Sequence, residues 1–130
     1  MAISPTFPQV SLTRLSKVHP DLQRLMVEAR RTAKVPFIIT EGLRDLERQK
    51  KLKAAGGSQT LNSRHLTGHA VDIAIVVDGQ VRWDWPLYDE MAAHIKVTAK
   101  KLGIAIQWGG DWKSLRDGPH FELTWKAYPL

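Results

Sequence analysis

The segment "SRHLTGHAVD", residues 63–72, holds two histidines four residues apart and an aspartate three residues after the second. On a helix, His65 and His69 would share one face, which is the spacing of a helical zinc site. However, Leu66 stands where the catalytic examples of such sites carry a glutamate, and Gly68 interrupts the helix. Because the run that follows is β-branched, the segment is predicted to be a loop and a bend that lead into a strand.

A strand from His69 onward separates the two histidines. Side chains alternate between the faces of a strand, so Asp72 and the alanines two residues to either side share one face, and His69 lies on the other. A carboxylate in an apolar strand is costly unless a charged partner or a metal meets it. Gly68 permits a bend that can fold His65 over the Asp72 face. A buried ion pair between Asp72 and an arginine is the alternative.

The motif "DGPHFEL", residues 117–123, supplies two further side chains. His120 begins a strand and would be a third ligand of a catalytic zinc, which keeps its fourth position for water. Asp117 can accept a proton from that water without occupying the metal. Two neutral imidazoles and one carboxylate leave the site positive, which lowers the pKa of the water from about 15.7 toward about 7. The alternatives are a structural histidine and an aspartate that only forms a turn.

The composition limits what these residues can be. With 130 residues, 43% of them hydrophobic and 25% charged, the chain is typical of one globular domain. It has no cysteine, so a metal must be bound by His, Asp or Glu. The net charge of +6 favours contact with polyanions such as a bacterial envelope, and no nucleic-acid-binding motif is present. No apolar run approaches the roughly 20 residues of a membrane span, and the N-terminus lacks a signal-peptide pattern.

The elements that must position these residues follow from hydrophobic periodicity and from turn residues. They indicate an α+β fold, with a small, mainly antiparallel sheet flanked by about three helices in a single domain. Residues 1–17 are predicted to be an extended N-terminal arm. Helices are predicted from Pro20 and over 44–57 and 86–102, and strands over 35–40, 70–77, 104–108 and 120–125, with a hairpin turn after residue 77.

Two other side chains are candidates for contact with a substrate. Arg44 lies where a strand ends and a helix begins, and its charge can stabilise a developing oxyanion, an effect often worth about 2.7–4 kcal/mol for one donor. The alternative for Arg44 is a surface ion pair with Glu47, three residues on. Trp112 is the tryptophan most suited to line a substrate groove, whereas Trp83 and Trp108 are expected in the core.

These motifs resemble those of a known family. "SRHLTGHAVD" fits the Ser-x-His-x-x-Gly-x-Ala-x-Asp signature of zinc peptidases that cleave bacterial cell-wall peptides. These are the D-Ala-D-Ala carboxypeptidases and dipeptidases and the L-alanyl-D-glutamate peptidases of phage endolysins. "DGPHFEL" and "TEGLRDLERQ", residues 40–49, resemble further elements of the family, and "GGDW", residues 109–112, resembles one of the endolysin branch. The resemblance runs from about residue 18 to 125.

The resemblance implies a role for each matched position. Asp117 would act as general base and then as the acid that protonates the leaving amine, although many relatives have Glu there. Arg44 would hold the peptide carbonyl or its oxyanion. Ser63 would lie near the metal and help to fix the substrate. One zinc ion would be bound by His65, Asp72 and His120.

The resemblance also implies a function, a phage-type endolysin that hydrolyses the L-alanyl-D-glutamate bond of peptidoglycan stem peptides. Such a chain is expected to be a monomeric catalytic domain without a separate cell-wall-binding domain and without a specific nucleic-acid partner. It would be made in the host cytoplasm and act on the periplasmic wall after membrane permeabilisation. Two alternatives remain: a D-alanyl-D-alanine carboxypeptidase or dipeptidase with the same zinc site, and a zinc-stabilised wall- or nucleic-acid-binding module. The binding module would need neither Asp117 nor Arg44.

Overall fold

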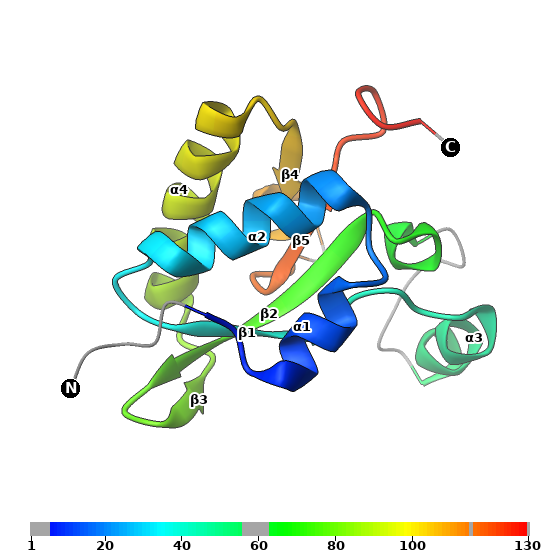
Figure 1. Ribbon diagram of the computed structural model, residues 1–130. Coiled ribbons are helices and arrows are strands. Elements are labelled where there is room, and N and C mark those ends of the chain that lie inside the picture. Colours follow the sequence, from blue (N-terminus) through cyan, green and yellow to red (C-terminus); the bar gives the residue numbers. More distant parts are fainter. Residues whose placement is uncertain (1–5, 56–62, 115, 130) are drawn as a thin grey trace.

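The structure, a computed structural model, describes residues 6–55, 63–114 and 116–129 (Figure 1). The α+β class is confirmed. The helices are α1 Gln9–Leu15, α2 Pro20–Thr32, α3 Leu46–Ala54 and α4 Trp85–Leu102, with short 3₁₀ turns η1 Arg64–Thr67 and η2 Gly109–Asp111. The strands are β1 Phe37–Glu41, β2 Ala70–Val77, β3 Gln80–Arg82, β4 Ile106–Trp108 and β5 His120–Leu123.

The strands form one antiparallel sheet in the order β1-β2-β5-β4, and β3 pairs with β2 as a hairpin. The hairpin turn consists of Asp78 and Gly79, which both have positive φ angles, 51° and 78°. A two-residue type I′ turn requires this conformation, and the Asp-Gly pair is typical of it. Strand β2 occupies the residues predicted for it and lies in the middle of the sheet, so its two faces decide what the rest of the chain can pack against.

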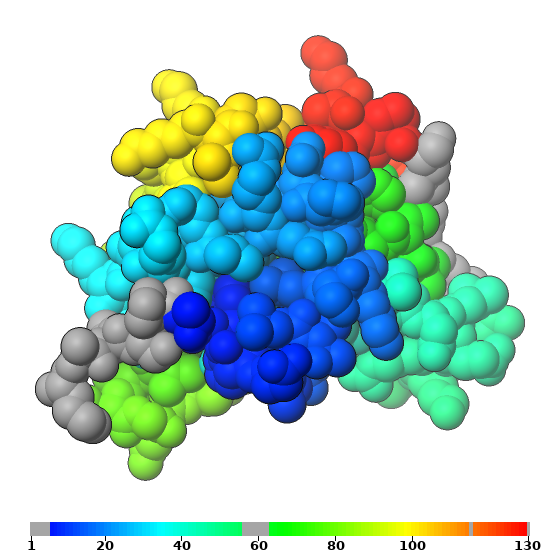
Figure 2. Space-filling model, in the orientation of Figure 1, coloured from blue at the N-terminus to red at the C-terminus, as the bar shows by residue number. Residues whose placement is uncertain are grey.

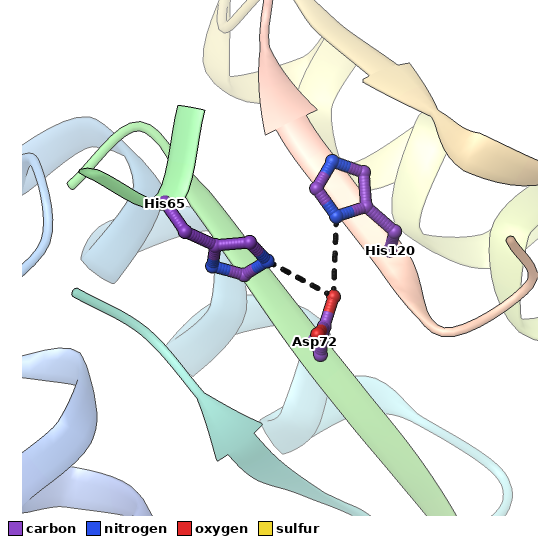
Figure 3. A group of neighbouring side chains, drawn as sticks. All are labelled: His65, Asp72 and His120. Carbon is purple, nitrogen blue, oxygen red and sulfur yellow. Dashed lines mark hydrogen bonds and ion pairs between the residues drawn. The ribbon is translucent and has the colours of Figure 1, made fainter. Parts of the chain in front are cut away.

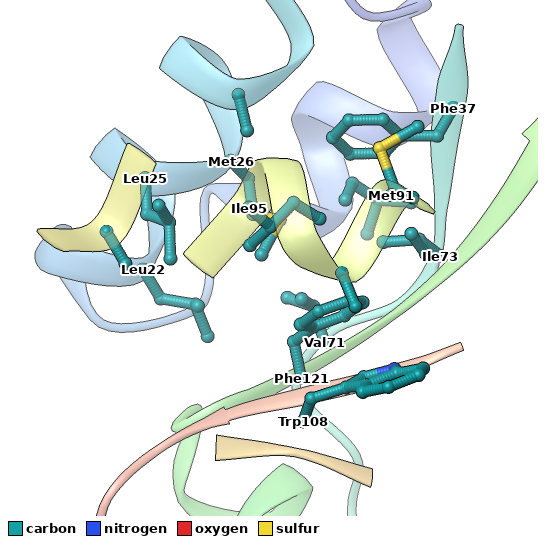
Figure 4. Close-up of a cluster of buried hydrophobic side chains, with 14 of the residues drawn as sticks. Leu22, Leu25, Met26, Phe37, Val71, Ile73, Met91, Ile95, Trp108 and Phe121 are labelled. Atoms are coloured by element: carbon teal, nitrogen blue, oxygen red, sulfur yellow. The ribbon is translucent and has the colours of Figure 1, made fainter. Parts of the chain in front are cut away.

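The apolar face of the sheet is covered by α1, α2 and α4 (Figure 1). Figure 2 shows the outer surface of this layer, where side chains of α1 and α2 close over the sheet. Beneath them lies the core, drawn in part in Figure 4, in which helical side chains meet those of β1, β2 and β5. Its fully buried members include Leu22, Leu25, Met26, Phe37, Ile73, Ile95 and Phe121. The opposite face of β2 and β5 is thereby left for polar side chains.

The extended arm expected over residues 1–17 is wrong where the structure describes it, because residues 9–15 form α1. This helix packs on β1: Ser11 Oγ accepts a hydrogen bond from Ile39 N at 3.0 Å, and Arg14 Nη1 donates to Ile39 O at 2.9 Å. A seven-residue helix is too short to be stable alone or to show a clear apolar stripe. Tertiary contacts with β1 therefore stabilise α1, and the described residues contain four α-helices.

Other differences from the sequence-based expectations are small. Trp108 is buried as expected, but Trp83 is 59% exposed and stacks on Tyr88, so its assignment to the core is wrong. Helix α3 begins only after Asp45, whose side chain caps it, and the glycine pair expected to end it lies outside the described residues. Within the ranges that the structure describes, no helix is long and apolar enough to cross a membrane.

Gly68 ends η1 and joins it to β2 with a φ of 74°, and a Cβ there would lie 3.0 Å from the backbone oxygen of Lys17. The Gly68→Ala substitution adds this contact to the left-handed strain of roughly 1–2 kcal/mol. Gly103→Ala is a matched control, since its φ is 72° but nothing lies within 4 Å of the Cβ position. We expect Gly68→Ala to lower the free energy of unfolding by about 1 kcal/mol more than Gly103→Ala in urea denaturation. Equal losses would contradict a close approach at residue 68.

Candidate metal centre

Strand register places three ionisable residues in one row across the sheet. Glu41 on β1 pairs with Asp72 on β2, and Asp72 pairs with His120 on β5. Directly opposite side chains on one face have Cβ atoms about 4.5–5.5 Å apart. The neighbouring pair, Val71 and Phe121, points to the core and is fully buried. The predicted alternation along β2 is confirmed, and its polar face carries Asp72.

The turn η1 brings His65 over this row. The hydroxyl of Ser63 accepts a hydrogen bond from the backbone N of His65 at 3.2 Å and so caps the turn. His65 is only 2% exposed. His69 lies apart from it, with its Nδ1 2.6 Å from the hydroxyl of Thr67 and its ring 5.6 Å from that of His19. The predicted separation of His65 from His69 is therefore what the structure shows.

His65, Asp72 and His120 converge (Figure 3). Asp72 Oδ1 lies 3.2 Å from His65 Nε2 and 3.1 Å from His120 Nδ1. One possible ligand atom from each residue lies within 4.8 Å of the other two. Segments that are far apart in the sequence thus bring together the three residues expected to bind a metal.

The outer nitrogens of both imidazoles face hydrogen-bond acceptors. His65 Nδ1 lies 2.8 Å from the carbonyl oxygen of Gly42, and His120 Nε2 lies 2.7 Å from Glu122 Oε1. Because these oxygens accept, the outer nitrogens donate, and in the neutral rings the inner nitrogens carry lone pairs. Two lone pairs beside the carboxylate oxygen of Asp72 repel it unless a proton or a cation lies between them. The donor set therefore fits a bound divalent metal ion.

The electrostatics of the row lead to the same conclusion. Burial alone would lower the pKa of His120, but its hydrogen bonds to Asp72 and Glu122 outweigh this and raise the pKa to about 9. Burial alone would raise the pKa of Asp72, yet hydrogen bonds from His120 and His65 hold it well below its usual range. The cluster therefore attracts positive charge, which a proton or a metal ion can supply.

Asp117 lies beside the cluster and is half-buried. Burial and the negative charge of Asp72 raise the pKa of the Asp117 carboxyl above its ordinary value. Its backbone N donates to the carbonyl of Gly109 at 3.0 Å. A Cβ at Gly109 would lie 2.4 Å from the Asp117 carbonyl oxygen and 3.1 Å from His120 Cβ, so glycine allows η2 to pack this closely. A carboxyl whose pKa is raised toward neutrality is suited to acid–base chemistry.

Arg44 is also at the site, but it is held by neighbours that were not predicted. Its Nε and Nη2 donate to the two carboxylate oxygens of Glu41 at 2.7 and 2.6 Å, and its Nη1 donates to Gln49 Oε1 at 2.7 Å. Arg44 Nη2 lies 3.8 Å from Asp72 Oδ2, so Asp72 does have the arginine neighbour that one alternative expected. The alternative ion pair between Arg44 and Glu47 is wrong, because Glu47 is exposed and pairs with a lysine of α3.

Trp112 follows η2 and is half-buried, and its ring centroid lies 5.0 Å from that of His120. The tryptophan expected to contact the substrate is therefore beside the cluster of His65, Asp72 and His120. Every residue predicted for the site lies in or beside the cluster, apart from Ser63, whose described contact is with the backbone of His65.

Sequence reasoning missed the residues that hold the site residues in place. Glu122 had a usable signal, since strand alternation puts it on the same face as His120, opposite the small Ala70. Glu41 and the carbonyl of Gly42 had none, because their roles depend on where β1 and η1 meet.

The fold and the cluster define the class of protein, an α+β domain with one candidate metal centre among its described residues, on the polar face of its sheet. A sequence model of the family described as phage L-alanyl-D-glutamate peptidase matches residues 3–124. The chain belongs to this family.

Individual relatives agree with this assignment. An L-alanyl-D-glutamate peptidase of Escherichia phage T5 is 29% identical over 134 residues, covering 91% of this chain and 97% of that protein. One from Listeria phage A118 is 34% identical over 94 residues, but this chain spans only 32% of its length. The crystal structure of the L-Ala D-Glu endopeptidase ChiX of Serratia marcescens matches with a TM-score of 0.90 and 46% identity, covering 98% of this chain and 96% of that one.

The contact between Glu122 and His120 predicts a measurable effect on metal binding. Glu122→Gln keeps the size of the side chain but removes the charge that orients the imidazole and makes it more basic. We expect zinc affinity to fall about 10-fold, within the range usual for such partners, in competition with a chromophoric chelator. Glu47→Gln, an exposed glutamate on α3, is the control and should bind zinc normally. Unchanged affinity in Glu122→Gln would show that His120 does not need this partner.

Proposed function

We propose that the chain is a phage-type endolysin, a zinc-dependent peptidase that hydrolyses the L-alanyl-D-glutamate bond of peptidoglycan stem peptides. The observation that carries the proposal is the pair of inward-facing imidazole nitrogens, of His65 and His120, on one carboxylate oxygen of Asp72. Membership of the family supports the choice of bond.

His65, Asp72 and His120 are the proposed zinc ligands, because two imidazole nitrogens and a carboxylate are a donor set that zinc favours. When bound, the ion supplies Lewis-acid polarisation of the peptide carbonyl and makes a water more acidic. The hydrogen bonds to Gly42 and Glu122 fix both rings before the ion arrives, so little reorganisation is needed on binding.

Asp117 is the proposed acid–base residue. It takes a proton from the attacking water and returns one to the amine nitrogen that leaves. Its raised pKa favours the first transfer, since the carboxylate takes up a proton more readily than that of an exposed aspartate. An aspartate side chain is one methylene shorter than a glutamate side chain, so its backbone must lie closer to the cluster. The close packing of Gly109 against Asp117 and His120 places the backbone of Asp117 near the cluster.

Arg44, Ser63 and Trp112 complete the proposed site. Arg44 stabilises negative charge on the carbonyl oxygen, and Glu41 and Gln49 hold its guanidinium still for that purpose. Ser63 caps the turn that carries His65 and helps to fix the substrate. The ring of Trp112 offers an apolar surface to the peptide beside His120.

The proposed biological setting follows the endolysin assignment. The described fold is the catalytic domain, acting as a monomer. The protein is made in the host cytoplasm and reaches the periplasmic wall once the membrane has been permeabilised. Its net charge of +6 favours contact with the anionic envelope.

Digestion of purified peptidoglycan tests the choice of bond. With zinc present, we expect mass spectrometry to find stem peptides that begin with a free D-glutamate amine. Removal of the metal by a chelator should stop the reaction, and added zinc should restore it. Release of free D-alanine with the L-Ala-D-Glu bond intact would favour the carboxypeptidase alternative. Peptidoglycan that is bound but not cleaved would favour the binding module.

Substitution of Asp117 separates catalysis from metal binding. We expect Asp117→Ala to fold normally and to retain zinc, but to lyse cells at least about 100-fold more slowly, because general acid–base catalysis is lost. His65→Ala should instead lose zinc and some thermal stability, since metal binding is coupled to folding. Metal content by mass spectrometry and a turbidity assay of lysis measure both. Undiminished lysis by Asp117→Ala would reject the assigned base.

A further inference from the structure

The two histidines proposed as zinc ligands come from elements that are not strand partners (Figure 3). His120 begins β5, which is fixed to β2 by the hydrogen bonds of the sheet. His65 lies on η1, a four-residue 3₁₀ turn outside the sheet. Such a turn has few internal hydrogen bonds of good geometry, so contacts from outside must fix it. The 5.1 Å between the centroids of the two rings therefore depends on what holds η1 to the rest of the chain.

On the side of β1, backbone groups hold η1. Arg44 N donates to the carbonyl oxygen of His65 at 2.9 Å, and His65 Nδ1 donates to that of Gly42 at 2.8 Å. Both partners lie in the loop after β1, which ends at Glu41. These bonds fix η1 relative to β1 and leave its distance from β5 to other contacts.

Arg64, at the start of η1, joins that turn to β5. Its side chain is buried, and its Nη2 donates to the carbonyl oxygen of Leu123, the last residue of β5, at 3.2 Å. The same nitrogen lies 2.7 Å from the carbonyl oxygen of Tyr128 and 3.3 Å from that of Thr124. The guanidinium carbon lies 4.1 Å from the centroid of the Trp125 ring. One buried side chain thus connects η1 to the end of β5 and to the turn that follows it.

The guanidinium also interacts with the partner of the other histidine. Glu122 precedes Leu123 on β5, and its carboxylate accepts a hydrogen bond from His120 Nε2 at 2.7 Å. Burial lowers the pKa of the Arg64 guanidinium, and the negative charge of Glu122 acts in the opposite direction. A cation at this place therefore supports the carboxylate that orients His120, while the backbone of Arg64 leads into His65.

Stability of the fold alone does not account for a guanidinium at residue 64. Arg64 Nε and Nη1 are buried and have no hydrogen-bond partner among the described residues. Buried donors without a partner cost free energy, and an apolar side chain of similar size in place of a buried charge is often neutral or stabilising. The bonds that the Arg64 side chain does make run to β5 and to the turn after it, which indicates a role in placing η1.

We propose that Arg64 is a positioning residue of the metal centre, which sets the distance between His65 and His120 by joining η1 to β5. This inference rests on the proposed function, since zinc is the ion that the two rings would share. With Arg64 in place, both imidazoles face Asp72 before the ion arrives, so little reorganisation accompanies binding. Without it, η1 keeps its contacts with the loop after β1 but loses its bond to β5, and His65 can move away from His120.

Paired arginine substitutions test the proposal. Arg64→Met removes the guanidinium but keeps a long side chain in its place. We expect zinc affinity to fall about 10-fold, in competition with a chromophoric chelator, and the absorption spectrum of the cobalt(II)-loaded protein to change with the coordination geometry. Arg30→Met is the matched control, because Arg30 is also buried, with Nε and Nη1 likewise unpartnered among the described residues, but lies on α2 at the opposite face of the sheet. Whatever its effect on melting temperature, Arg30→Met should bind zinc and cobalt(II) as the unmodified chain does.

A third variant keeps the test decisive if Arg64→Met does not fold. Arg64→Gln retains a donor amide but is too short to reach the carbonyl of Tyr128, so we expect a normal fold and a smaller but measurable loss of zinc affinity. Unchanged zinc affinity and cobalt(II) spectrum in either folded Arg64 variant, or equal changes in Arg30→Met, would overturn the role of Arg64 alone. Failure of the unmodified chain to bind zinc would overturn the proposed function, and this inference with it.

Discussion

The approach of two imidazole nitrogens to one carboxylate oxygen is the constraint on which the rest of the site depends. His65 Nε2 and His120 Nδ1 both lie within 3.2 Å of Asp72 Oδ1. Their outer nitrogens are held by Gly42 and Glu122, so neither ring can turn away to relieve the repulsion between lone pairs and carboxylate. A proton or a metal ion between these three atoms relieves the repulsion.

Acidic side chains lie next to the two imidazoles, and arginines lie farther out. Asp72 and Glu122 supply negative charge next to the imidazoles, and Glu41 continues the row on β1, where Arg44 and Arg48 neutralise it. Burial raises the pKa of Glu41, but its hydrogen bonds to these arginines outweigh this and lower it. Glu41 therefore fixes Arg44 beside the cluster and offsets part of its positive charge.

The two faces of the sheet have different roles, since one packs in the core and the other carries the site. Alternate residues of β2 and β5 point to the helices and are fully buried, whereas Asp72 and His120 point to the other face. Polar groups that would be costly in the core are instead satisfied by one another or by a metal. Gly109 allows η2 to approach this face closely, because a Cβ there would meet the backbone of Asp117 and the side chain of His120. Gly68 allows the end of η1 to approach the backbone of Lys17 and Val18 before α2.

The sequence by itself determined which residues converge from the segments around β2 and β5. Period-two alternation fixed the face of Asp72, the bend at Gly68 freed His65, and His120 followed a turn at the start of a strand. Local pattern is enough there, since strand alternation does not depend on distant contacts. Only the tertiary structure decided the partners: Glu41 and Gln49 for Arg44, the carbonyl of Gly42 for His65, and the packing of α1 on β1. The sequence pattern of one segment does not indicate which other segment it will contact. These contacts could therefore not be predicted, because they form where strand ends, turns and a short helix meet in space.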